Sequence, residues 1–306
     1  MSSLMTNASA MTALQTLRST SANLAETQNR ISTGYRVAGA EDNAAYWSIA
    51  TTMRSDNMAL GAVEDSLGLG AATVDVMYTA MDSTVDVMNE IKAKAVAART
   101  PGVDRSKIQS DITELQNQLQ STAESAVFNG ENWLNWDTAS GVTSKDIVSS
   151  FTRSGGAIEI QVTTVDITST QLFDEGGTGT GILDFDRGFA ALTNVTGDGI
   201  FDFDLSGVTD ADTASIDALV DGIDAALGQI TDAATLLGSI KSRVDLQTDF
   251  VSNLRDAIDR GIGQLVDADM NAESTRLQAL QTQEQLGIQA LTIANQGSQN
   301  ILSLFR

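Results

Sequence analysis

The chain of 306 residues contains no cysteine, no histidine and a single proline. The missing cysteines exclude a disulfide framework, a thiol nucleophile and a cysteine-bearing zinc site, and the missing histidines exclude a histidine-based catalytic triad. Proline usually makes up about 5% of a protein and breaks helix interiors, so its near absence favours long helices. The one proline, Pro101, precedes Gly102 and predicts a turn between two helical stretches.

Basic residues are also scarce, with 18 Lys and Arg against 40 Asp and Glu, giving a net charge of −22. Nucleic-acid binding needs a basic face for phosphates, so we expect no nucleic-acid partner. The acidic residues are spread along the chain, which indicates a solvated surface rather than an acidic tail.

Long apolar runs are missing too, since no stretch approaches the ~20 residues that span a bilayer. Residues 1–22 carry neither a basic segment nor an apolar core of the secretory type. We therefore expect a soluble protein without membrane insertion, either cytoplasmic or exported without a cleaved signal peptide.

The strongest positive pattern is an unbroken apolar heptad repeat in the C-terminal part. A seven-residue repeat keeps one stripe of a helix facing a partner helix, here over ~75 Å. A second repeat in the N-terminal part, in which Thr84 and Ala95 also take part, supplies the partner. The predicted intrasubunit core consists of Val74, Met77, Met81, Met88 and Ile91 on one side and Ile216, Ile223, Ile230, Leu237, Val244, Val251, Ile258 and Leu265 on the other.

Weaker apolar stripes at the two chain ends predict terminal helices over 3–34 and 272–306, and stronger patterns predict helices over 44–100, 104–128 and 212–265. Alternating runs at 147–151 and 158–165, separated by Ser154-Gly155-Gly156, predict a β-hairpin. Residues 170–209 are rich in Gly, Thr and Asp, and the alternation Phe201-Asp202-Phe203-Asp204 within them predicts a strand with one solvent-exposed face.

These elements predict a mainly α fold, a long antiparallel helical bundle or coiled coil built from both chain ends, with a β-hairpin and a small β-containing outer insert. We expect three domains: residues 1–43 with 266–306 as an inner terminal-helix domain, 44–165 with 210–265 as a helical core with the hairpin, and 166–209 as a small variable outer domain.

Four sequence segments carry a resemblance to a known family. They are Leu-Ala-Glu-Thr-Gln-Asn-Arg-Ile-Ser-Thr-Gly at 24–34, Ala-Glu-Asp-Asn-Ala-Ala at 40–45, Phe-Asn-Gly at 128–130 and the ending Ala-Asn-Gln-Gly-Ser-Gln-Asn-Ile-Leu-Ser-Leu-Phe-Arg at 294–306. With them the chain resembles bacterial flagellin over residues 1–165 and 212–306, whereas the insert between matches nothing assignable.

The resemblance implies a structural protein, neither an enzyme nor a cofactor binder, that self-assembles into the flagellar filament for swimming motility. It implies a helical homopolymer, alone or with sister flagellins, and as further partners an export chaperone, the filament cap and hook-junction proteins. It also implies export through the flagellar type III channel to the outside of the cell. The expected inner filament interface consists of Leu14, Leu17, Leu24, Ile31, Leu277, Leu280, Ile288 and Leu291.

Two other readings stay open: the hook–filament junction protein, which would have the same architecture, and, from another class, a secreted coiled-coil adhesin or binding module. Asp184, Asp186, Asp198, Asp202, Asp204, Asp210 and Asp212 are candidate cation ligands, but their spacing fits no EF-hand loop and favours solvated side chains. The Asn194-Val195-Thr196 triplet fits an N-glycosylation acceptor that occurs often by chance, and O-linked sugars on the insert stay undecided.

The resemblance extends to segments that host immune receptors read. In the plant-receptor segment, residues 29–50, Tyr35, Gly39, Tyr46 and Trp47 depart from the common pattern. In the vertebrate-receptor segment, residues 88–97, Glu90 replaces a usual basic residue and Lys94 a usual apolar one. Bulky or wrongly charged side chains at these positions oppose binding to the receptors, so we expect weak or absent activation of both.

Overall fold

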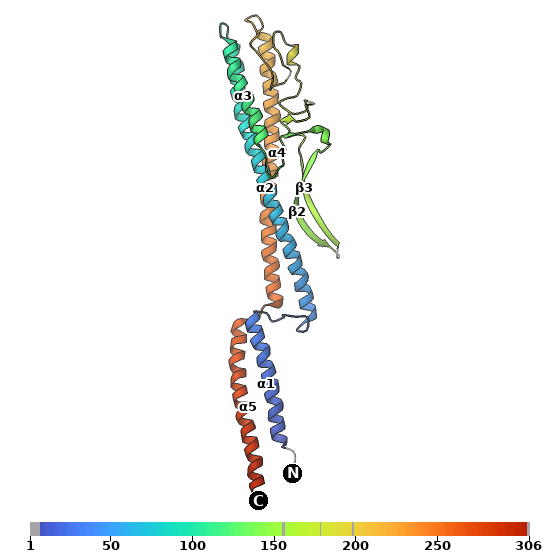
Figure 1. Cartoon of the computed structure of the whole chain (residues 1–306), viewed down its shortest axis with the longest axis vertical. Helices are drawn as coiled ribbons and strands as arrows, with labels where there is room; N and C mark the ends of the chain where they lie inside the picture. Colours follow the sequence, from blue (N-terminus) through green and yellow to red (C-terminus); the bar gives the residue numbers. More distant parts are fainter. Residues whose placement is uncertain (1–6, 155–156, 178, 198, 305–306) are drawn as a thin grey trace. The chain divides into compact units, whose positions relative to one another are not determined.

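The computed structural model describes residues 7–154, 157–177, 179–197 and 199–304 (Figure 1). Within them, helices dominate and the strands pair two by two, which confirms the predicted mainly α fold. In chain order the elements are α1 (Ala8–Thr33), α2 (Ala44–Ala98), α3 (Arg105–Ser125), β1 (Asn135–Trp136), η1 (Thr138–Ser140), β2 (Ser144–Ser154), β3 (Ala157–Asp166), β4 (Phe173–Asp174), η2 (Phe189–Ala191), α4 (Thr213–Val266) and α5 (Met270–Leu304). The outermost residues of the expected terminal helices (3–6 and 305–306) and Asp198 lie outside the described residues.

The chain forms two compact units, Met1–Met58 with Arg255–Arg306 (the terminal unit) and Ala59–Leu254 (the central unit). Helices α2 and α4 each contribute to both. The insert at 166–209 falls within the central unit, and its separate folding stays a prediction, as do the other domain limits expected from the sequence.

In the terminal unit, α1 and α5 lie side by side and antiparallel, so the start of α1 and the end of α5 lie at the same end of the pair (Figure 1). Helix α1 starts at Asn7, whose side chain accepts a hydrogen bond from the backbone N–H of Ala10. It ends at Gly34, where φ is +76°, a backbone conformation that glycine adopts without strain.

In the central unit, α2 and α4 run antiparallel in constant register. Lys241 pairs with Asp75, Lys92 with Asp224 and Arg99 with Asp217. From one pair to the next, the number of residues gained toward the C-terminus of α2 equals the number lost toward the N-terminus of α4. Constant register over this length is what a sustained heptad repeat requires.

Helix α3 packs beside α2 and holds the insert through two buried glutamines seven residues apart. The Gln109 amide nitrogen donates to the carbonyl of Phe203 at 3.1 Å, and its oxygen accepts from the N–H of Leu205 at 3.0 Å. The Gln116 amide nitrogen donates to the carbonyl of Ile200 at 3.0 Å. These hydrogen bonds give partners to buried backbone N–H and C=O groups of the insert that no neighbouring β-strand pairs.

The hairpin forms as expected and is longer, since β2 and β3 pair antiparallel from Ser144↔Asp166 to Ser154↔Ala157 with a bulge between Val148 and Ser150. The expected strand at 201–204 is wrong. Phe201 and Asp202 form a turn, Phe203 belongs to no regular element, and Asp204 makes only an isolated bridge to Thr196. The buried Phe203 gives its carbonyl to the side chains of Gln109 and Gln116 instead of to a neighbouring strand.

Candidate assembly surfaces

Three contacts fix the register of the α1–α5 pair. The Asn7 side-chain nitrogen donates to the carbonyl of Ala294 at 3.0 Å at one end. In the middle, a Cβ added to Gly287 would lie 3.2 Å from the Leu17 Cδ1 atom, so the two helices approach closely there. At the other end Arg30 pairs with Glu273 at 3.2 Å.

The seam between α1 and α5 is thinly apolar. At its heptad positions the buried side chains are small or polar, except for Leu280. The larger apolar side chains on it are only half-buried. The buried group is Ala10, Thr20, Thr27, Glu273 and Leu280, and the half-buried group is Leu17, Leu24, Ile31, Leu277 and Leu291. Hydrophobic stabilisation scales with buried apolar area, so this seam alone holds the pair weakly.

A second set of apolar residues on the same two helices lies off the seam. The expected interface residues Leu14 and Ile288 belong to this outer set. The other members, which sequence reasoning missed, are Met11, Leu286 and Ile293, and the five side chains are between 40% and 69% exposed. They could be found from the sequence only once the seam positions were known, since they sit one residue before or after a seam position.

The connection between α1 and α2 forms a small core with the end of α4. Val37, Ala50, Ile262 and Val266 are buried there. The N–H groups of Arg36 and Val37 donate to the Val266 carbonyl at 2.6 and 3.2 Å.

Ile258 and Leu265, two residues of the predicted heptad core, are only half-buried, whereas Ile262 and Val266 are buried. Ile262 and Val266 are the residues that form the small core with Val37 and Ala50, so the connection between α1 and α2 decides which positions are buried at this end of α4.

The residues that depart from the plant-receptor pattern lie around this connection. Tyr35 bridges to Asp267 and carries the Arg54 guanidinium 5.2 Å from its ring centroid. Tyr46 and Trp47 are exposed on the first turn of α2.

Gly39 lies in a turn closed by Asp42, whose carboxylate accepts the N–H groups of Ala38 and Gly39 at 2.9 and 3.1 Å. These hydrogen bonds, with a smaller contribution from the Arg30 charge, hold the pKa of Asp42 below its ordinary value.

The predicted core residues of the central unit are all buried. Val74, Met77, Met81, Met88 and Ile91 are inaccessible on α2. On α4 so are Ile216, Ile223, Ile230, Leu237 and Val251, and Val244 is 1% exposed.

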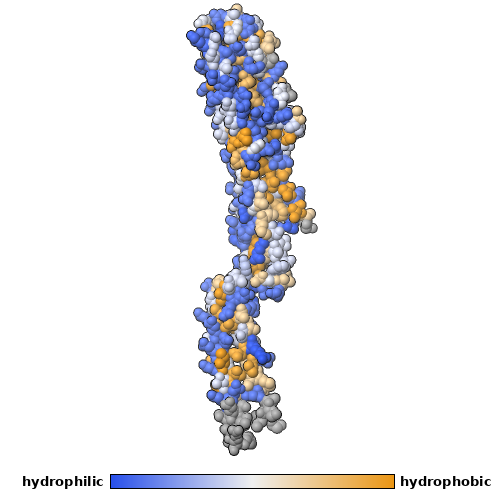
Figure 2. Space-filling model, viewed as in Figure 1, coloured by the Kyte–Doolittle hydropathy of each residue, from blue (hydrophilic) through white to orange (hydrophobic). Residues whose placement is uncertain are grey.

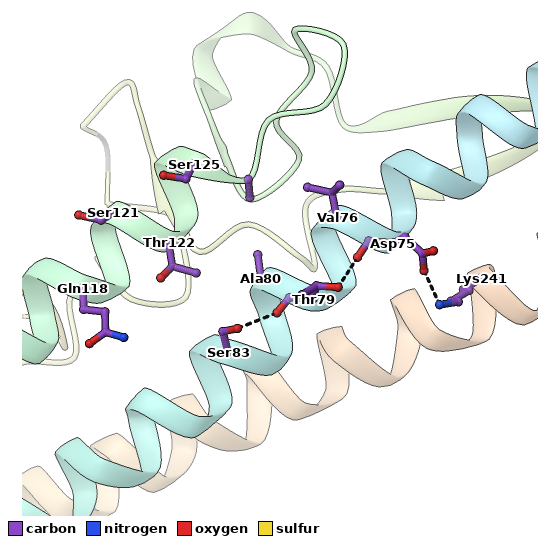
Figure 3. A pocket seen from close by; sticks show the side chains of 11 residues that line it. Asp75, Val76, Thr79, Ala80, Ser83, Gln118, Ser121, Thr122, Ser125 and Lys241 are labelled. Carbon is purple, nitrogen blue, oxygen red and sulfur yellow. Dashed lines mark hydrogen bonds and ion pairs between the residues drawn. The ribbon is translucent and has the colours of Figure 1, made fainter.

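Beside this core, two adjoining grooves run between α2 and α3 and share Gln118 and Ser121. One, of about 700 Å³, is lined by small hydroxyl side chains such as Thr79, Ser121 and Thr122 and closed at one end by the Asp75–Lys241 ion pair (Figure 3). The other, of about 660 Å³, contains both residues that depart from the vertebrate-receptor pattern, the exposed Glu90 and Lys94, which pairs with Asp111.

The aspartates of the insert serve the local structure. The Asp184 carboxylate accepts a hydrogen bond from the backbone N–H of Asp174 at 2.8 Å. Burial raises the pKa of Asp184, and this effect outweighs the hydrogen bond, which lowers it. Asp212 accepts from Thr209 and from the side chain of Asn194, which lowers its pKa. Among the residues that the structure describes, no group of three acidic side chains is placed to hold a metal ion.

No helix in the described parts of the chain combines the length and the apolar character needed to cross a membrane.

Comparisons with known proteins agree on one family. The family model for the bacterial flagellin N-terminal helical region matches residues 4–138, and the one for the C-terminal helical region matches residues 220–305. Flagellin C of Rhizobium meliloti (strain 1021) is 50% identical and Flagellin A of the same strain 45% identical, each with both chains covered completely. A flagellin of Brucella melitensis biotype 1 is 43% identical over the same full coverage.

Among solved structures, one described as a flagellar hook-associated protein from Vibrio parahaemolyticus matches with a TM-score of 0.50 at 14% identity, covering 74% of this chain and 100% of that one. At this identity the likeness concerns the fold alone.

Proposed function

Because this chain belongs to the bacterial flagellin family, and is therefore a structural subunit that self-assembles into a flagellar filament, we propose that its α1–α5 pair carries the innermost contacts between copies. The observation that carries this proposal is the combination of a thin seam and an exposed apolar outer set on the same two helices.

The two sets of apolar residues have different parts in this proposal. The seam residues Leu17, Leu24, Ile31, Leu277, Leu280 and Leu291 join α1 to α5 within one copy. The outer residues Leu14 and Ile288, with Met11, Leu286 and Ile293, face other copies. A pair too weakly apolar to be stable alone gains its order when many copies cover these residues. Contacts between unlike surfaces of identical copies produce an open helical assembly.

The filament reading is favoured over the hook–filament junction protein and the adhesin. The full-length relatives named above are flagellins, and the likeness to a hook-associated protein extends only to the fold.

Two substitutions test the two sets separately. Leu24→Asp places a charge in the seam, so it should abolish filaments while the central unit keeps its helical circular dichroism. Leu286→Asp places a charge in the outer set, so it should abolish filaments and leave the monomer's spectrum unchanged. Leu286→Met, which keeps the apolar surface, is the matched control. Electron microscopy of concentrated protein gives the readout. Normal filaments from either Asp variant would contradict the placement of that residue.

We further propose that the subunit leaves the cell through the flagellar export channel uncleaved, with an export chaperone, the cap and hook-junction proteins as partners. The filament contains this chain alone or with sister flagellins. The intact mass of subunits from sheared filaments tests the first point, since a mass lowered by a removed N-terminal segment would refute it.

We also propose that this chain activates the plant and the vertebrate immune receptors weakly or not at all. Support comes from the exposed aromatic pair Tyr46 and Trp47, from exposed Glu90, and from Lys94, which Asp111 engages. A strong reporter-cell response to purified monomer would refute the vertebrate part. An oxidative burst from leaf tissue given the 29–50 peptide would refute the plant part.

A further inference from the structure

The two faces of the β2–β3 hairpin have different surroundings. Cross-strand partners lie on the same face, so Ile147 and Thr163 share one face, while Ile160 and Phe151 share the other. Ile147 is buried on α2, where its Cγ2 atom would lie 2.5 Å from a Cβ added to Gly70. The hairpin therefore turns one face toward its own helices and the other outward.

The outward face is apolar. Ile158, Ile160 and Val162 alternate along β3 and are between 46% and 60% exposed. Phe151 and Val148 stand opposite Ile160 and Val162. Apolar surface covers the hairpin in the space-filling view (Figure 2). A two-stranded sheet is marginal in water, and an exposed apolar face of this kind marks an interaction site.

Helix α4 of the central unit carries a second exposed apolar pair. Leu246 and Phe250 are 68% and 56% exposed. They are four residues apart and so share one face of the helix, away from the buried Val244 and Val251. Half-buried Leu254 continues this face by one turn, and exposed Arg243 lies one turn before it.

The two surfaces match in length and in charge. From Val162 to Ile158 the strand advances ~13 Å, and from Leu246 to Leu254 the helix advances ~12 Å. Exposed Asp146, which pairs with Thr164, lies on the outward face just beyond the Val148–Val162 pair, and exposed Arg243 lies just beyond Leu246 on α4. Aligning the apolar residues therefore brings a carboxylate against a guanidinium.

We propose that in the filament the outward face of one copy's hairpin packs on Leu246 and Phe250 of a second copy, with Asp146 facing Arg243. This inference rests on filament assembly. The contact joins two different patches of one chain, so it repeats from copy to copy without closing, as a filament requires. The occupant is a second copy because the hairpin's own helices meet its opposite face.

The lack of native cysteine allows a clean cross-linking test. Ile160→Cys and Phe250→Cys monomers are mixed, polymerised, checked for filaments by electron microscopy and treated with diamide, which takes the two thiol hydrogens as the disulfide forms. A disulfide needs Cα atoms within about 7 Å. The expected result is a mixed disulfide dimer from filaments and none from unpolymerised monomers.

A neighbouring position provides the matched control. Glu159→Cys is exposed on the opposite face of the same strand, so it should not cross-link to Phe250→Cys. Filaments without the Ile160–Phe250 cross-link, or with equal cross-linking from Glu159→Cys, would overturn the proposal while leaving filament assembly intact.

A charge exchange gives a second, independent readout. Arg243→Asp should raise the critical concentration for polymerisation about two- to fivefold, the effect of one exposed ion pair turned repulsive. Adding Asp146→Arg to the same chain should restore it. If the double variant polymerises no better than Arg243→Asp alone, Asp146 does not face Arg243 and the proposed alignment is refuted.

Discussion

Two glycines on α2, two residues apart, provide a test of how the hairpin is anchored. A Cβ added at Gly68 would meet no heavy atom within 4 Å. A Cβ added at Gly70 would lie 2.5 Å from the Cγ2 atom of Ile147 and 3.3 Å from its Cδ1 and Cγ1 atoms. Both sites are helical, so the same substitution to alanine differs only in what the new methyl group meets.

The expected magnitudes follow from two opposing effects. Replacing glycine by alanine inside a helix stabilises it by about 1 kcal/mol, and at Gly68 this effect acts alone. At Gly70, Ile147 must also move by about 1 Å to reach an ordinary carbon–carbon contact, and overpacking of this kind costs about 1–3 kcal/mol. We therefore expect Gly68→Ala to gain about 1 kcal/mol and Gly70→Ala to lie between no change and a loss of about 2 kcal/mol.

Urea unfolding of the monomer, followed by far-ultraviolet circular dichroism, measures the difference between the two variants. Trypsin cleavage after Arg153 on β2 reports the hairpin directly, since only displacement of the hairpin should speed it. Combining Gly70→Ala with Ile147→Ala should cost less than the two single changes together, because the second removes the clashing atom. If Gly70→Ala stabilises the protein as much as Gly68→Ala, Ile147 does not anchor the hairpin at Gly70.

Three further predictions concern the two units. Lowering the pH should loosen the turn at 38–42. The N–H groups of Gly39 and Ala38 lower the pKa of Asp42 in the folded protein. The ionised carboxylate therefore stabilises the turn fully above about pH 4, and this stabilisation is lost as the pH falls through the folded pKa. Lower protection of those two amides by NMR at acid pH, measured against the intrinsic exchange rate at the same pH, tests this, and Asp42→Asn should show low protection at every pH. Ile230→Ala, which empties a fully buried site, should cost about 2–5 kcal/mol in urea unfolding, and a loss below about 1 kcal/mol would mean that the site is not packed as described. Hydrogen peroxide should convert Met58, which is highly exposed, to the sulfoxide well before the inaccessible Met81, and peptide mass spectrometry showing equal rates would refute the burial of the α2 core.

Much of the fold was predictable because its signals are local. Heptad spacing, the Pro101-Gly102 turn and the alternation around Ser154-Gly155-Gly156 each depend on residues close in sequence. The Phe128-Asn-Gly130 turn is a further case, since Asn129 and Gly130 both take positive φ and Phe128 bridges to Glu131.

The errors fall where long-range contacts decide. The Phe-Asp alternation at 201–204 predicts a strand, yet Gln109 and Gln116 of α3 take the backbone groups that a neighbouring strand would have paired. At the end of α4 the strict heptad places Ile258 and Leu265 in the core, whereas Ile262 and Val266 are the buried residues, because they pack with Val37 and Ala50 of the α1–α2 connection and the start of α2.

For the assembly surfaces, the sequence identified apolar side chains on the terminal helices but could not separate the seam from the outer set. A thin stripe has too few apolar residues to mark one face of a helix. Only the pairing of Leu17 with Gly287 and of Arg30 with Glu273 shows which positions face the partner helix. Leu286 and Ile293 become interface candidates once those positions are fixed.

The sequence by itself determined that this chain is built mainly of long helices, because a heptad repeat and a near absence of proline favour helical backbone over many residues, and its four signature segments carry the resemblance to the flagellin family. Tertiary structure decided which apolar residues remain for other copies. That choice depends on which faces the chain covers with its own helices and hairpin, and burial is a property of the packed molecule rather than of any local stretch.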